Sequence, residues 1–278
     1  MKKLIAAAAA LAAFAAINTA SAADMALKAP PALVDPGWTG GYAGLDGGYS
    51  WGRSSTNITF FNSATGLPIV PPPGSITNSR FNLNGGVFGG QIGYNWQANS
   101  NIVLGLETDL QWSGERGSAN YLCASVAIIG GVCMPGLTFL PAGATGTSLT
   151  LSEKIQWFGT FRARAGVLAT PGALLYVTGG AAYGEINENG VLTGFTPGGA
   201  ATALAFSNSV TKGGWTVGGG IEGRLGSPRW TGKIEYLYVD YGTVNSTAIN
   251  TLAGVGANIS SRVTDNVLRV GVNYHFNK

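Results

Sequence analysis

Charged residues are scarce in this chain of 278 residues, since Asp, Glu, Lys and Arg together make up 10% of it. A typical globular domain carries roughly a quarter. Too few ionised side chains are present to cover an ordinary water-facing surface, so a large part of the folded surface must face another medium. The formal net charge is +3 and the cations form no run or stripe, so nucleic acid binding is not indicated.

Long apolar runs are also missing, apart from one short segment near the N-terminus. Residues 4–17 are apolar, Lys2 and Lys3 precede them, and small residues follow at 20–22. This pattern predicts a signal peptide over 1–22. The alternative, an anchor helix, would need roughly 20 apolar residues. No later segment resembles a transmembrane helix.

The exported chain is then predicted to have two parts. Residues 23–37 are rich in Pro and Ala and are predicted to form a flexible periplasmic lead. Residues 38–278 are long enough for one sizeable domain.

Cysteine and histidine are nearly absent. Export places Cys123 and Cys133 in an oxidising compartment, which predicts a local disulfide between them rather than a metal site. The single histidine, His275, leaves little for nucleophilic catalysis, which needs a base beside the nucleophile. We therefore expect no enzymatic activity, no metal and no cofactor.

Short segments of alternating apolar and polar residues follow the lead and predict strands. The predicted strands are 41–52, 82–96, 101–113, 153–168, 174–185, 211–225, 230–241 and 264–276. The gaps between them alternate between short and long, and the long, polar ones are 54–80, 114–152, 186–210 and 242–262. Short periplasmic turns and long extracellular loops are typical of outer-membrane barrels. The predicted fold is therefore all-β, an eight-stranded antiparallel transmembrane β-barrel.

The alternation separates charged from apolar side chains. In 101–113, Leu104 and Leu106 share one face while Glu107 and Asp109 share the other. A charge that faces lipid at mid-depth costs about 2–4 kcal/mol, so the charged face is predicted to line the interior. A soluble barrel with the opposite orientation is the alternative. The predicted lumen charges are Asp46, Glu107, Asp109, Arg162, Arg164, Glu222, Arg224, Lys233, Glu235 and Arg269.

In the segment 153–168 the same alternation places Ile155 and Trp157 on the apolar outer face, opposite Lys154 and Gln156. Aromatic residues lie near both ends of the predicted strands, which is typical of the two membrane interfaces and favours the membrane barrel. The predicted aromatic girdles are Trp51, Trp112, Trp157, Tyr183, Trp215 and Tyr238 at the loop end, and Trp96, Trp230, Tyr274 and Phe276 at the turn end.

Five stretches carry a family resemblance: ADMALKAPP, WTGGYAGLDGGYSWG, WFGTFRARAGV, KIEYLYVDYG and DNVLRVGVNYHF. They resemble the small outer-membrane immunogenic, or porin-family, barrels of alphaproteobacteria in the Opa-like superfamily. The resemblance implies an abundant, surface-exposed barrel of the cell outer membrane that stiffens the envelope. Such barrels usually end on an aromatic residue that the assembly machinery reads, whereas here Asn277 and Lys278 follow Phe276.

The expected function is structural. An eight-stranded barrel is just wide enough for its side chains to fill, so paired charges are predicted to plug the lumen. The alternatives are a passive porin for small solutes, an adhesive protein acting through its loops, or a haem-binding protein using Tyr121 or Met134. Expected partners are outer-membrane lipids including lipopolysaccharide, the assembly machinery, and unidentified envelope or host-surface molecules.

Overall fold

The computed structural model describes residues 37–70, 77–124, 132–134, 146–195, 201–250 and 255–276. The predicted signal peptide, the lead before Gly37, Asn277 and Lys278 lie outside these ranges. The strands are β1 (Gly40–Asn62), β2 (Pro68–Ile69), β3 (Asn78–Gln97), β4 (Ile102–Ser113), β5 (Arg116–Ala124), β6 (Val132–Met134), β7 (Gly146–Thr170), β8 (Ala173–Phe195), β9 (Ala201–Arg224), β10 (Trp230–Asn250) and β11 (Val255–His275). No helix in the described ranges is long and apolar enough to span a bilayer.

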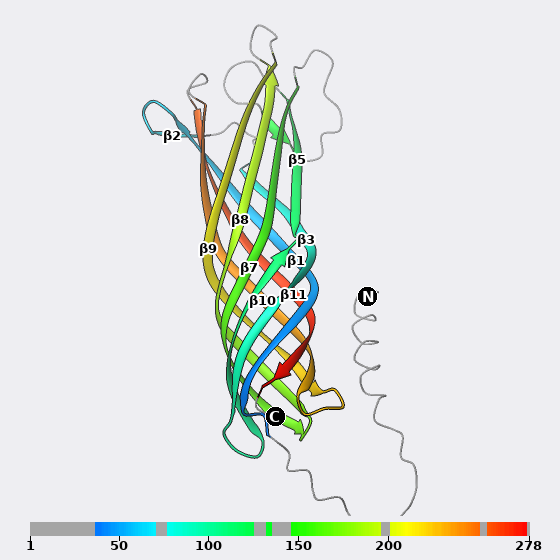
Figure 1. Ribbon diagram of the computed structural model, residues 1–278. Helices are drawn as coiled ribbons and strands as arrows, with labels where there is room; N and C mark the ends of the chain where they lie inside the picture. Colours follow the sequence, from blue (N-terminus) through cyan, green and yellow to red (C-terminus); the bar gives the residue numbers. More distant parts are fainter. Residues whose placement is uncertain are drawn as a thin grey trace, which may run out of the picture. The chain divides into compact units, whose positions relative to one another are not determined.

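Eight strands close into an antiparallel ring in the order β1, β3, β4, β7, β8, β9, β10, β11, with β11 paired back to β1 (Figure 1). On the loop side of β4, strand β5 takes the position of β4 between β3 and β7. Strands β2 and β6 are short and pair with β1 and β5 at the loop end. A closed ring leaves no sheet edge, so backbone polar groups can bond within the protein where lipid offers no partner. The predicted transmembrane barrel is confirmed.

Short turns join β3 to β4, β7 to β8 and β9 to β10 at one end of the ring. Gly226 adopts a positive φ of 65° in the last of these turns, a conformation that favours glycine. The pairing of Tyr42 with His275 places the start of β1 and the end of β11 at this same end. Both ends of the barrel chain therefore lie on the turn side, as an even number of strands requires.

Most of the predicted strand ends on the loop side are wrong, although β4 ends at Ser113 as predicted. β1 runs to Asn62 rather than residue 52, and β8 runs to Phe195 rather than residue 185. Much of each segment predicted as a loop is strand that continues the barrel away from the turns. The alternation changes character in these extensions, because most of their outward residues are polar (Ser, Thr, Asn or Arg) instead of apolar. A strand search based on an apolar outer face therefore stops too early.

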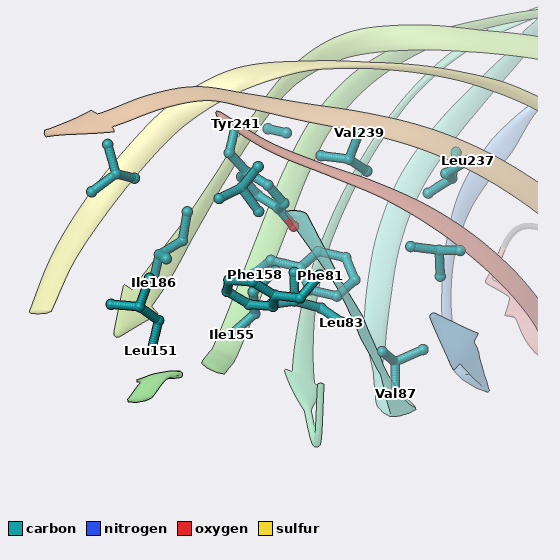
Figure 2. Close-up of a cluster of buried hydrophobic side chains, with 14 of the residues drawn as sticks. Phe81, Leu83, Val87, Leu151, Ile155, Phe158, Ile186, Leu237, Val239 and Tyr241 are labelled. Atoms are coloured by element: carbon teal, nitrogen blue, oxygen red, sulfur yellow. The ribbon is translucent and has the colours of Figure 1, made fainter. Parts of the chain in front are cut away.

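The inside and the outside exchange polarity along the barrel. Between the aromatic residues, Leu106 and Val270 face outward with exposed fractions of 53% and 57%, while Arg162 and Arg269 are fully buried inside. From the level of the loop-side aromatics onward, a large cluster of apolar side chains fills much of the interior (Figure 2). We call this group the apolar cluster; it contains Phe81, Leu83, Val87, Tyr121, Leu151, Ile155, Phe158, Ala182, Ile186, Leu237, Val239, Tyr241, Val244, Val263 and Val267. The band between the two groups of aromatic residues faces lipid and exposes apolar side chains. The extension beyond the loop-side aromatics faces water and exposes polar side chains.

One predicted orientation within β7 is wrong. The pairing of β7 with β8 shifts between Ile155 and Trp157, so Gln156 is an extra residue. Such a β-bulge reverses the face of every residue beyond it. Ile155 is consequently buried in the apolar cluster and Lys154 is exposed on the outer surface.

The polarity exchange predicts a position-dependent cost for the same substitution. Leu106→Arg, in the lipid-facing band, should lower the free energy of unfolding by about 2–4 kcal/mol, because the guanidinium would meet acyl chains. Ser207→Arg, an outward position of β9 beyond the aromatics, should change it by less than about 0.5 kcal/mol. Urea unfolding in phospholipid vesicles measures both. Equal losses for the two variants would contradict the proposed membrane boundary.

Candidate functional site

The predicted lumen charges come together inside the ring. Asp46 lies on β1, Glu107 and Asp109 on β4, Arg162 and Arg164 on β7, Glu222 on β9, Lys233 and Glu235 on β10, and Arg269 on β11. All nine are at most 3% exposed, and we call them the charge network. The tenth predicted member, Arg224, is only partly buried, and its guanidinium donates to the carbonyl of Gly37 at 3.2 Å at the turn end. Alternation places all nine side chains on the inner face, and the ring brings them into contact.

Two arginines link most of the acids. Arg162 pairs with Asp109 at 2.9 Å and with Glu235 at 3.0 Å, and it also bonds Glu107. Arg269 reaches the same acids from the other side, with Asp109 at 2.9 Å and Glu235 at 2.6 Å. Each guanidinium therefore serves several carboxylates, which a planar group with five N–H donors does well.

One ion pair crosses the full width of the barrel. Lys233 on β10 lies 3.2 Å from the Oε1 atom of Glu107 on β4. Three strands separate β10 from β4 in either direction around the ring. Opposite walls of the ring are thus in direct contact through side chains.

A second group lies nearer the turns. Arg164 pairs with Glu222 at 2.6 Å, and its guanidinium lies 4.1 Å from the centre of the Tyr176 ring. Glu222 also accepts hydrogen bonds from Thr231 at 2.6 Å and Asn273 at 2.9 Å. A buried carboxylate needs such partners because an unpaired ion in a confined site is costly.

Sequence reasoning missed several neutral members of the site. The Tyr42 hydroxyl donates to Glu107 at 2.7 Å, and the Tyr176 hydroxyl donates to Glu235 at 2.9 Å. A Cβ at Gly93 would collide with the Tyr42 ring, so that glycine makes room for it. Both tyrosines point into the barrel, because each lies two positions along its strand from another inward residue. Their parity along the strand is a usable signal, but the sequence prediction assigns aromatic residues to the membrane interfaces.

Trp38 closes the turn end of the lumen and was also missed. It is fully buried, its indole N–H donates to the carbonyl of Pro171 at 3.2 Å, and the Arg224 guanidinium lies 5.6 Å from its ring centre. His275 is also fully buried, 6.0 Å from Trp38 and 5.3 Å from Tyr42 between ring centroids. The sole histidine therefore lies within the sealed end of the barrel.

The apolar cluster lies on the loop side of the charge network. Phe158 and Tyr241 project into the barrel from different strands and are fully buried (Figure 2). Between the cluster and the charges, Ser50 donates to the carboxyls of Asp265 at 2.5 Å and Glu115 at 3.0 Å. The lumen is thus filled in successive layers: Trp38, the charge network, and the apolar cluster.

Two further acids face each other beyond the aromatics. Glu153 and Glu188 are directly paired across β7 and β8, and both are 4% exposed. Glu153 accepts a hydrogen bond from Ser54 at 2.8 Å, and Glu188 accepts one from Ser246 at 2.5 Å. Burial raises the pKa of Glu153 to about 7 and also raises the pKa of Glu188. The sequence analysis does not predict this pair, because Glu153 shares the parity of the predicted outer face of 153–168 and Glu188 lies in the predicted loop 186–210.

The predicted girdle residues all lie on the outer surface. Trp112, Trp96 and Phe276 are the most exposed, at 63%, 58% and 59%. Several rings touch a neighbour, for example Trp215 and Tyr238 with centroids 5.4 Å apart, and Trp230 and Tyr274 at 5.1 Å. They form one group near the turns and one partway along the strands.

The remaining predicted residues lie at the loop end. Cys123 and Cys133 occupy directly opposite positions of β5 and β6. Their disulfide stays a prediction. The expectation that Tyr121 is available on a loop surface is wrong, because this side chain is buried in the apolar cluster and its hydroxyl bonds Ser79. Its ring therefore faces the interior rather than an external ligand.

Comparison with known proteins gives a consistent assignment. A family model described as "Outer membrane protein beta-barrel domain" matches residues 6–276. The chain is 36% identical to the 31 kDa outer-membrane immunogenic protein of Brucella melitensis biotype 1, over 93% of this chain and 94% of the relative. It is 27% identical to the 25 kDa outer-membrane immunogenic protein of Brucella abortus biovar 1, over 99% of both. Among solved structures, OprG of Pseudomonas aeruginosa aligns with a TM-score of 0.47 and 12% identity over 87% of this chain and 99% of that one.

The raised pKa of Glu153 predicts a pH-dependent stability. The folded protein holds a proton here up to about pH 7, whereas an exposed glutamate loses it near pH 4.5. Stability from this group is therefore present below pH 4.5 and is lost as the pH rises toward 7, by about 3 kcal/mol in all. Glu153→Gln should be more stable than the wild type at pH 8 and nearly equal to it at pH 4.

Urea unfolding at several pH values measures this difference. Glu185→Gln is the matched control, because it removes a carboxyl from the outward face of the neighbouring strand β8. In this variant the free energy of unfolding should still decline with rising pH as in the wild type. A Glu153→Gln protein with the full wild-type pH dependence would show that this carboxyl is not the responsible group.

Proposed function

The chain belongs to the outer membrane protein β-barrel family and resides in the cell outer membrane, and from this premise we propose that it acts there as a closed structural barrel. Its lumen is occupied by its own side chains and does not conduct solutes. Its role is to contribute to the integrity of the envelope and to present the loop-side extension at the cell surface. The name of the Brucella relatives, immunogenic protein, supports the surface exposure.

The observation that carries the proposal is the Lys233–Glu107 pair, which joins opposite walls of the ring. A continuous aqueous path would have to pass this pair. Arg162 and Arg269 fill the space beside it, and both are fully buried.

Opening the lumen would be expensive. Separating Arg162 or Arg269 from its carboxylates would leave buried ions without partners, and breaking such a pair costs about 3–5 kcal/mol. Each arginine contacts several acids, so the pairs would break together. The apolar cluster forms a second obstacle, because an apolar constriction is poorly wetted. These two layers favour a closed barrel over a passive porin.

A non-enzymatic role fits the position of His275. Its Nε2 atom lies 3.1 Å from the Thr231 hydroxyl and 3.5 Å from Glu222, but all three residues are fully buried. Trp38 and Tyr42 pack against the imidazole. A substrate would have to displace the tryptophan before it could reach any base in this region.

Planar-bilayer recording of the refolded full barrel tests the closed lumen. The wild type should give no stable conductance steps, because two filled layers block the axis. Stable steps of one reproducible size in the wild type would overturn the proposal.

The structural role of the charge network has a separate test. Arg162→Ala with Arg164→Ala should lower the free energy of unfolding by at least about 3 kcal/mol, since several carboxylates would lose their partners. Arg229→Gln is a matched control because Arg229 is an exposed arginine at the turn end, outside the lumen; it should shift stability by less than about 0.5 kcal/mol. A double variant as stable as this control would show that the network does not support the fold.

A further inference from the structure

Exposed cations lie on one side of the barrel just beyond the loop-side aromatics. Arg53 is on β1, Arg80 on β3, Arg116 on β5 and Lys154 on β7, and these four strands are contiguous in the sheet. All four side chains are exposed on the outer face. We call these four residues the basic face.

The basic face has no acidic counterpart. None of the ion pairs among the described residues involves its members, whereas nearby Arg262 is paired with Asp240 at 2.6 Å. On the other side of the barrel, the outward positions of β8, β9 and β10 beyond the aromatics carry Glu185 and the buried, paired Asp240 and, within the described ranges, no cation. The positive charge is therefore one-sided, and no ion pair among the described residues compensates it.

The spacing of these cations is unfavourable without an anion. Arg116 and Lys154 are directly opposite each other in the β5–β7 pairing, and like charges in that position are destabilising. Arg53 is opposite Asn82, so Arg80 is its diagonal neighbour, at about 7–8 Å. The basic face thus contains two pairs of neighbouring cations that repel each other. Such clustering is notable in a chain in which only a tenth of the residues are charged.

Their height places them among lipid headgroups. Arg53 is two residues beyond Trp51, and Arg116 is four residues beyond Trp112, which is about 7 and 13 Å along the strand. Strand tilt of about 40° reduces the second distance to about 10 Å in height. Headgroups extend about 5–8 Å beyond the hydrocarbon on each side of a bilayer, and sugar-bearing headgroups extend further.

We propose that the basic face binds the phosphorylated sugar headgroup of lipopolysaccharide in the outer leaflet. Phosphate groups between Arg116 and Lys154, and between Arg53 and Arg80, would convert each repulsive pair into a charge-assisted clamp. The lipid chains of the same molecule would lie along the apolar band below. This inference rests on the outer-membrane location and not on the closed lumen.

The test compares full barrels in nanodiscs of phosphatidylcholine, with or without added lipid A that carries its phosphates. Lipid A should raise the thermal unfolding midpoint of the wild type by several degrees. In Arg116→Gln with Lys154→Gln, and in Arg53→Gln with Arg80→Gln, the rise should be largely lost, and lipid A retained after washing should fall at least tenfold. Arg229→Gln is the matched control, because it removes an exposed arginine at the turn end, and it should keep the full rise.

A sign reversal separates binding from damage to the fold. In phosphatidylcholine alone, Arg116→Gln should be at least as stable as the wild type, because the repulsion from Lys154 is gone. In lipid A it should be less stable than the wild type. A variant that is less stable in both lipids, or a wild type that gains nothing from lipid A, would overturn the proposal.

Three further additions identify the source of the anion. Dephosphorylated lipid A should give no rise. An equal rise with inorganic phosphate alone would indicate a site for free anions and contradict the lipid assignment. Binding of a soluble sulfated polysaccharide that requires the same four residues, without any rise from lipid A, would assign the basic face to surface glycans instead.

Discussion

The cost of placing an ionised side chain in hydrocarbon governs this structure. At mid-depth that cost is about 2–4 kcal/mol for each arginine or lysine. Four cations and five acids of the charge network lie at the level of the membrane, so their combined exposure to lipid would exceed the stability of most domains. Enclosing them in the ring removes this cost only if they neutralise each other. The dense pairing of the network follows from that requirement.

The same constraint explains why the barrel exchanges polarity along its length. Leu106 faces lipid and Glu107 faces inward, whereas further along the barrel Asn187 is the outward residue and Ile186 the buried one. Each strand is continuous through the change, and the closed ring satisfies the backbone in both media. The aromatic residues mark the boundary because their rings are apolar and their polar atoms reach water. Beyond that boundary the arrangement resembles a soluble barrel, with a cluster of buried apolar side chains inside and polar side chains outside.

Filling the interior also limits what the protein can do. The charge network needs glycines on neighbouring strands, such as Gly93 against Tyr42, to fit long side chains into a narrow ring. Trp38 occupies the turn end and the apolar cluster occupies the loop side. On the outer surface, the basic face carries charges that no ion pair among the described residues neutralises.

The sequence by itself determined the eight strands, their turn-side ends and which residues of the lipid-facing band point inward. These follow from local alternation, and the low charge content made the membrane the only suitable medium for the apolar face. Tertiary structure alone decided where the strands end on the loop side, because polar outward residues there carry no apolar signal. It also decided the face of Ile155, which depends on a single extra residue in β7. Finally, it decided the partners within the charge network: alternation assigns a face to each residue, whereas closure of the ring sets Lys233 opposite Glu107 across the barrel.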